Sequence, residues 1–153
     1  MADRVFYSAS AAGEHGLVWI ALGGLRALRG GTHRRAGRRI AVGIVIESLV
    51  VNGGIKSLFR RRRPVLTEPR PLHLRIPITS SFPSGHASAA FFGAALLSDG
   101  DEALAPLYYG LALVVSASRV YVKIHHASDV VGGMVVGAGL GRLAKRLMPL
   151  GGD

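Results

Sequence analysis

The stretch FPSGHASAAFFGAALL, residues 82–97, places a proline, two small residues and a histidine directly ahead of a run of apolar residues. Pro83 stiffens the entry to a helix, and the Ser84 hydroxyl can accept a hydrogen bond from the first free backbone N–H groups. The apolar run that follows predicts a helix that begins near His86. Taken alone, the stretch favours a simple helix cap with His86 there by chance, so the other segments must show whether the histidine has a chemical role.

The composition combines high apolar content with a strong positive charge. The chain has 153 residues, is 49% hydrophobic, and has a mean hydropathy of +0.34 and a formal net charge of +10. A soluble basic protein is seldom so apolar, so this pairing favours a membrane protein whose charges lie in loops. Few aromatics and no basic recognition helix argue against a nucleic-acid partner. The absence of cysteine excludes disulfides and thiolate metal sites. The length predicts one domain, residues 1–153.

Charged residues divide the chain into five apolar segments, at roughly 16–28, 40–59, 86–97, 104–122 and 130–147. A straight membrane span needs about 20 apolar residues, and only the second and fourth segments approach that length. Runs of Gly, Ala, Leu and Val suit lipid-facing helices better than barrel strands. We therefore predict an all-α, polytopic membrane helix bundle of about five transmembrane helices. Residues 1–15 are polar and small and contain no cleavable signal. The longest segment without a helical pattern is 64–83, with a turn at 67–71.

Two features inside the apolar segments bear on packing. Gly133, Gly137 and Gly141 recur every four residues, which puts them on one face of the fifth helix and lets another backbone approach closely. Packing within the chain is the favoured use of this face, and a homo-oligomer interface is the alternative. Glu47 is costly inside an apolar segment, so we expect it to have a role or a partner, either an arginine or Asn52.

Basic residues close the second segment in KSLFRRRRP, residues 56–64. Lys56 and Arg63 lie seven residues apart, so they share a helix face with Arg60 if the helix continues to the proline, whereas Arg61 would point elsewhere. Cations at a helix end indicate, by themselves, only an interfacial anchor or a complement to the helix dipole.

A second polar group lies in SRVYVKIHHASDV, residues 118–130. His125 and Asp129 are four residues apart, so they share a face at the start of the fifth helix. A carboxylate in that position can take the Nδ1 proton of the imidazole and leave Nε2 facing outward as a nucleophile or base. Arg119 does not share that face in a continuous helix, so we expect the chain to break near Lys123.

These polar groups fall on one membrane face if every segment crosses the bilayer once. The second and fourth segments end there, and the third and fifth segments begin there. Cations and free backbone N–H groups at a helix start are typical of a phosphate site. We therefore predict a phosphate-processing site at this face. Its candidate residues are Lys56, Arg63, Ser84, Gly85, His86, Arg119, His125 and Asp129.

The pattern resembles the three-part signature of the type 2 phosphatidic acid phosphatase family. The parts are Lys56, six residues, Arg63-Pro64; then Pro83-Ser84-Gly85-His86; then Ser118-Arg119, five residues, His125, three residues, Asp129. Every signature position is filled at the family's spacing. The resemblance implies a helical integral membrane enzyme that needs no metal or other cofactor and removes phosphate from lipid phosphates and diphosphates.

The resemblance also implies a role for each signature residue. His125 would attack phosphorus to form a phosphohistidine, and Asp129 would hold its tautomer. His86 would protonate the leaving lipid oxygen and then help to activate water. The phosphate oxygens would be bound by Lys56, Arg63, Ser84, Gly85 and Arg119. His126, beside the nucleophile, is expected to point elsewhere as a bystander.

Two other functions share some of these residues. Vanadium haloperoxidases carry the same constellation, but they are large soluble proteins, which a short apolar chain fits poorly. A non-catalytic lipid-phosphate binder or membrane scaffold would need only the cations. Within the phosphatase family the substrate is phosphatidate, phosphatidylglycerol phosphate, a polyprenyl diphosphate or polyprenyl-phosphoryl-ribose phosphate, and no motif separates these lipids.

The distribution of arginine predicts the cellular setting. Six arginines lie in the expected loop 26–39, and Arg142, Lys145 and Arg146 follow the fifth segment. The positive-inside rule puts both groups in the cytoplasm and the catalytic face outside it. Abundant Arg, Ala and Gly suggest a GC-rich bacterium, so we expect the protein in a bacterial inner membrane.

Overall fold

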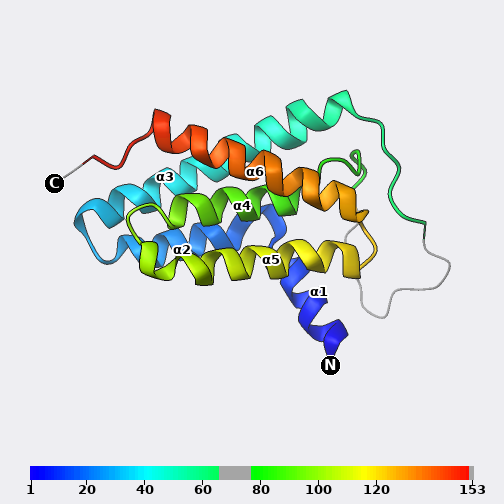
Figure 1. The fold of residues 1–153 in the computed structure, drawn as a ribbon, viewed down its shortest axis with the longest axis horizontal. Coiled ribbons are helices and arrows are strands. Elements are labelled where there is room, and N and C mark those ends of the chain that lie inside the picture. Colours follow the sequence, from blue (N-terminus) through cyan, green and yellow to red (C-terminus); the bar gives the residue numbers. More distant parts are fainter. Residues whose placement is uncertain (66–76, 152–153) are drawn as a thin grey trace.

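The computed structural model describes residues 1–65 and 77–151, which form a bundle of helices (Figure 1). The helices are α1 (Ala2–Ala12), α2 (Leu17–Ala27), α3 (Gly31–Ser48), α4 (Gly85–Leu97), α5 (Ala105–Tyr121) and α6 (Ala127–Leu147). Beyond α3 the chain continues as a π-helix, Leu49–Gly54, and a 3₁₀ turn, Ile55–Leu58; two more 3₁₀ turns, Glu14–Gly16 and Glu102–Leu104, precede α2 and α5. The described ranges contain no strand, which confirms the all-α prediction. The predicted turn at 67–71 lies outside the described residues.

Helix α4 occupies the centre of the bundle, between α6, α5 and α3 (Figure 1). It is apolar on all sides, and such a helix is stable only when it is surrounded. Ten of its thirteen residues are buried. Phe92 and Leu96 pack with Trp19 of α2 and Val115 of α5 in the main core. Neighbouring helices therefore hold α4, whose first turn carries His86, in place from several directions.

The glycine face of α6 packs against α4. A Cβ atom added at Gly137 would lie 2.8 Å from the carbonyl carbon of Ser88, and one added at Gly133 would collide with the carbonyl oxygen of Ser84. Gly141 extends the same close approach toward the C-terminus. Packing within the chain, the favoured interpretation, is confirmed. The face is covered by α4, and the alternative of a homo-oligomer stays a prediction.

Two helical stretches are long and apolar enough to cross a membrane, Gly31–Leu58 and Glu102–Tyr121. Helices α2 and α4 are apolar but shorter. The expectation of about five spans therefore remains a prediction for the other helices. The sequence left open whether residues 1–15 form a helix, and the structure shows α1 there, packed against α5.

The arginine-rich stretch 26–39 is mostly helical, which corrects the expected loop. Helix α2 ends at Ala27 and α3 begins four residues later. Buried Arg26 donates to Leu97 O and Asp99 O, both at 2.8 Å, and Arg39 pairs with the Asp99 carboxylate at 2.7 Å. The carbonyl groups at a helix C-terminus lack partners within the helix, so cations stabilise that end. These two arginines therefore bind the end of α4 and are not free loop charges.

The helix that carries Lys56 ends earlier than predicted. Its last helical residue is Leu58, and Phe59 is extended, with φ −122° and ψ 139°. The chain was expected to stay helical to the proline, which would have put Arg63 on the same helix face as Lys56. Paired glycines just before Lys56 weaken the helix, and four successive arginines at its end repel one another. Arg63 consequently reaches the site from an extended segment.

Candidate active site

A cavity of about 280 Å³ lies where the expected polar groups converge. It is bordered by Lys56 beyond α3, Gly85 and His86 at the start of α4, and His125 between α5 and α6. Residues from three separate parts of the sequence thus meet at one end of the bundle, as the signature spacing predicted. Residues 77–79 and the 3₁₀ turn before α2 complete part of the wall.

The start of α4 forms one end of this cavity. The Ser84 hydroxyl accepts a hydrogen bond from the backbone of Ala87 at 3.4 Å, so Ser84 is the predicted helix cap. A Cβ atom added at Gly85 would lie 2.8 Å from Asn52 Oδ1 and 3.4 Å from Lys56 Nζ. The Lys56 ammonium therefore lies against the first turn of α4. A cation and a helix N-terminus together provide a favourable place for a phosphate.

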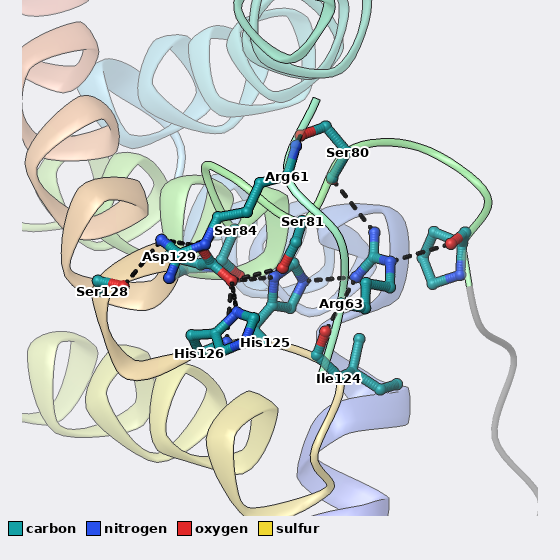
Figure 2. Close-up of polar contacts among 12 residues, drawn as sticks. Arg61, Arg63, Ser80, Ser81, Ser84, Ile124, His125, His126, Ser128 and Asp129 are labelled. Carbon is teal, nitrogen blue, oxygen red and sulfur yellow. Dashed lines mark hydrogen bonds and ion pairs between the residues drawn. The ribbon is translucent and has the colours of Figure 1, made fainter. Parts of the chain in front are cut away.

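Arg63 joins the extended segment to the loop that carries His125, as Figure 2 shows. Its guanidinium donates to Pro77 O at 3.0 Å, Thr79 O at 3.1 Å and Ile124 O at 3.2 Å. The same group lies 3.2 Å from Nε2 of His125. These backbone contacts fix the position of an arginine that no helix carries.

His125 is neutral, with its proton on Nδ1. An arginine can only donate, so Nε2 must accept the hydrogen bond from Arg63, and the proton then resides on Nδ1. Burial first, and then the charges of Arg63, Arg119 and Lys56, lower the pKa of His125 to about 3. Its Nε2 therefore has an available lone pair beside a cation, which is the state that a nucleophilic imidazole requires.

Asp129 is fully buried behind the imidazole (Figure 2). Its Oδ2 accepts hydrogen bonds from Ser81 Oγ at 2.5 Å and from the backbone N–H of His126 at 2.9 Å. The distance from Oδ2 to Nδ1 of His125 is 3.7 Å, which exceeds a hydrogen bond. His125 precedes α6, which begins at Ala127, so the two side chains do not share a helix face as predicted, although they lie side by side. Such contacts commonly tighten only when the substrate binds.

Two residues expected to point elsewhere contact Asp129. Arg61 lies 2.9 Å from Oδ1, and His126 Nδ1 lies 3.2 Å from Oδ2. Arg61 reaches the site because alternate residues of an extended segment face the same side, so it accompanies Arg63. His126 is the N-cap residue of α6, and Asp129 is three residues into that helix, the spacing of a capping box.

Arg119 is buried at the end of α5 and turns toward α1. Its Nη1 donates to Ser10 Oγ, and its carbonyl accepts from the backbone N–H groups of Ile124 and His125, both at 3.2 Å. Lys123 has a positive φ of 53°, which confirms the predicted break before α6. Arg119 thus holds the backbone of the loop that carries His125.

Sequence reasoning missed several polar contacts at this end of the bundle. Glu47 is only 2% exposed and accepts a hydrogen bond from Ser88 Oγ at 2.5 Å. The expected partner was an arginine or Asn52, so that expectation is wrong. The signal was a serine at an inward position of an otherwise apolar helix. Ser81 and Ser10 carried no distinguishing pattern, because each acts through a contact distant in sequence.

Comparison with known proteins agrees with this geometry. The family model of the PAP2 superfamily matches residues 37–151. A decaprenylphosphoryl-5-phosphoribose phosphatase from Mycobacterium tuberculosis, found in strains CDC 1551 and H37Rv, is 31% identical over 132 residues, which cover 86% of this chain and 72% of the relative.

A solved structure shares the fold. It is the crystal structure of a transmembrane PAP2 type phosphatidylglycerolphosphate phosphatase from Bacillus subtilis, with a TM-score of 0.61 and 23% identity, covering 95% of this chain and 83% of that one. The family match spans most of the sequence and contains all three signature segments. The chain therefore belongs to the PAP2 superfamily.

Proposed function

We propose that the protein is a metal-independent phosphatase that hydrolyses a phosphomonoester or diphosphate of a membrane lipid through a phosphohistidine at His125. The observation that carries this proposal is the neutral imidazole of His125, whose Nε2 lone pair lies beside Arg63 at a cavity that His86 also borders. A site built only to bind phosphate would need the cations and would not need two histidines.

Binding comes first in the proposed mechanism. The phosphate lies against the first turn of α4 and the Lys56 ammonium, where a helix N-terminus and a cation both favour an anion. Arg63 releases Nε2 of His125 and donates instead to a phosphate oxygen, because that oxygen offers a stronger, charge-assisted hydrogen bond. That exchange exposes the nucleophile only when a phosphate is present.

Phosphoryl transfer follows. Nε2 of His125 forms a bond to phosphorus while the bond between phosphorus and the lipid oxygen breaks, and His86 gives that oxygen a proton. His125 becomes positively charged, so its Nδ1 proton is drawn toward Asp129 across the present 3.7 Å. Cations around the equatorial oxygens stabilise the charge that shifts during transfer.

Hydrolysis completes the cycle. His86, now neutral, accepts a proton from a water molecule as the water oxygen attacks phosphorus, and the bond to Nε2 breaks. Inorganic phosphate and the dephosphorylated lipid are the products, and both histidines return to their starting states.

We further propose a bacterial inner-membrane location with the catalytic cavity on the extracytoplasmic side. Two spanning candidates and the transmembrane B. subtilis neighbour support the membrane setting. Arg26 and Arg39 bind the end of α4 and are not free loop charges. The positive-inside argument for the orientation of the chain in the membrane therefore rests on the other basic residues near that end. Among the four candidate lipid substrates of this protein, its similarity to the M. tuberculosis phosphatase supports polyprenyl-phosphoryl-ribose phosphate.

Burst kinetics on purified protein test the mechanism. His125→Ala should abolish phosphate release from lipid phosphates and from nitrophenyl phosphate, because both need the nucleophile. His86→Ala should lower the rate on lipids by roughly 10²- to 10⁴-fold but preserve the initial nitrophenolate burst, because that leaving group needs little protonation. A burst that survives in His125→Ala and disappears in His86→Ala would reverse the two roles.

A further inference from the structure

Glu47 borders the same cavity as the catalytic histidines, although the mechanism has no use for it. Ser88 donates to Oε1, and within the described residues Oε2 has no hydrogen-bond partner. A carboxylate beside a phosphate site repels the phosphate, so Glu47 does not serve the anion itself. Its free oxygen is instead available to the part of a ligand that lies beyond the phosphate.

A strip of polar residues connects Glu47 with the phosphate end of the cavity. Ser48, Asn52 and Lys56 follow one another at intervals of four, and all three border the cavity. The Asn52 amide donates to Ser48 Oγ at 3.1 Å, which leaves its Oδ1 as an acceptor near Gly85. Two oxygen acceptors, from Glu47 and Asn52, therefore lie next to the place where the phosphate binds.

Oxygen acceptors recognise hydroxyl groups. Phosphatidate and polyprenyl diphosphates carry no hydroxyl group between the phosphate and the hydrocarbon, so the buried Glu47 oxygen would stay unpaired with these lipids, which is costly, whereas Asn52 is exposed. A sugar or polyol phosphate carries hydroxyl groups two or three atoms from its phosphate. A cavity of about 280 Å³ is near the lower end of ligand sites, roughly 300–1,000 Å³, and suits a head group whose lipid chain lies outside.

We propose that Glu47 and Asn52 form a hydroxyl-binding subsite that selects lipids whose scissile phosphate is carried by a sugar or another polyol. The subsite rests on the proposed phosphatase function, and it adds a residue-level reason for substrate choice. Removal of the Glu47 carboxylate should reduce the preference for substrates with hydroxyl groups over substrates without them. It should leave the chemistry of His125 and His86 intact.

Paired substrates test the subsite on the full-length protein in detergent. Farnesylphosphoryl-5-phosphoribose is compared with its 2,3-dideoxy analogue, which has the same lipid and the same phosphate. Wild type should prefer the ribose substrate by roughly 10- to 100-fold in kcat/KM, as expected for hydrogen bonds to a buried acceptor. Glu47→Gln should abolish most of that preference by slowing the ribose substrate, with little change for the dideoxy analogue.

The matched control is Glu102→Gln, the same chemical change at an exposed position beyond the far end of α4. It should keep both the rates and the preference of wild type. Equal rates on the two substrates in wild type, or an equal loss on both in Glu47→Gln, would overturn the subsite. If Glu47→Gln does not fold, inhibition of wild-type nitrophenyl phosphate turnover decides: ribose 5-phosphate should inhibit more strongly than its 2,3-dideoxy analogue, and equal inhibition refutes the subsite.

Failure of the proposed function gives a different result. A wild-type protein that releases no phosphate from any lipid phosphate, or a His125→Ala variant that is fully active, would refute the phosphatase mechanism itself. Phosphate release that depends on His125 but ignores the hydroxyl groups would refute only the subsite.

Discussion

Gly137→Ala should push α6 away from α4. The added Cβ would lie 2.8 Å from the carbonyl carbon and 2.9 Å from the Cα of Ser88, and no side-chain rotation can relieve a contact with backbone. Carbon atoms pack at about 3.5–4.0 Å, so the helices must separate by about 1 Å. Overpacking of this kind costs about 3 kcal/mol at the upper end of its range. Alanine regains about 1 kcal/mol of helix propensity, which leaves a net destabilisation of about 2 kcal/mol.

The displacement should also slow catalysis. Helix α4 presents His86 and α6 presents Asp129, so a shift between the two helices changes the geometry of the site. A misplacement of about 1 Å lowers rates by about 10²-fold. Thermal unfolding in detergent, followed by the fluorescence of buried Trp19, should show a Tm about 4–8 °C below wild type. Initial phosphate-release rates measure the second effect.

Gly139→Ala is the matched control on the same helix. No described atom of another element lies within 4 Å of a Cβ added there, so the alanine gains helix propensity without a clash. The Tm should stay the same or rise, by up to about 1 kcal/mol of added stability, and activity should not change. Equal Tm values for Gly137→Ala and Gly139→Ala would refute the close approach of α6 to α4.

Three further predictions concern the site and its setting. Orthovanadate should inhibit phosphate release because the cation-lined cavity suits a phosphate mimic, while a chelator should not; activity that is lost in chelator and restored by magnesium contradicts this. The pKa of His125 is lowered from 6.5 to about 3, so at a pH between these two values the unfolded chain binds a proton at His125 that the folded chain does not bind. The free energy of unfolding should therefore fall with decreasing pH, by about 1.4 kcal/mol per unit at most, and His125→Asn should remove that part of the slope in thermal scans. A cysteine at position 67, outside the described residues, should be labelled from outside intact cells and one at Ser98 should not; the reverse pattern inverts the orientation.

Local chemistry explains which helices could be predicted. The start of α4 was expected at His86 and lies at Gly85, because a proline, a capping serine and an apolar run all act within a few residues. The break at Lys123 followed from the positions of polar residues on either side. Helix α1 had no comparable local signal. Its order comes from contacts with α5 that are distant in sequence, such as the stacking of Phe6 on Tyr121 with ring centroids 4.3 Å apart.

The residues of the candidate site likewise fall into those that the sequence could locate and those that it could not. Signature spacing located Lys56, Gly85, His86 and His125, and the structure brings these four to one cavity. Spacing could not place Arg61, because its direction depends on whether the chain after Leu58 is helical or extended. The partners of Glu47 and Arg119 were hidden for another reason. Each is a serine on a different helix, and helix-to-helix register is a tertiary property that no single segment encodes.

The π-helix at Leu49–Gly54 decides which side of the bundle Lys56 faces. Nine residues separate Glu47 from Lys56, so on a regular α-helix the two would lie on opposite sides, yet both border the cavity. A π-helix holds more residues per turn, so it takes up one extra residue and keeps the helix on either side in phase. After the loss of one residue here, the glutamate and the lysine would lie about 80° apart on a regular α-helix and would stay near the same side. A relative of unchanged length with a regular α-helix at this place would keep both residues and the whole phosphate signature, but it would present its glutamate and its lysine to different neighbours.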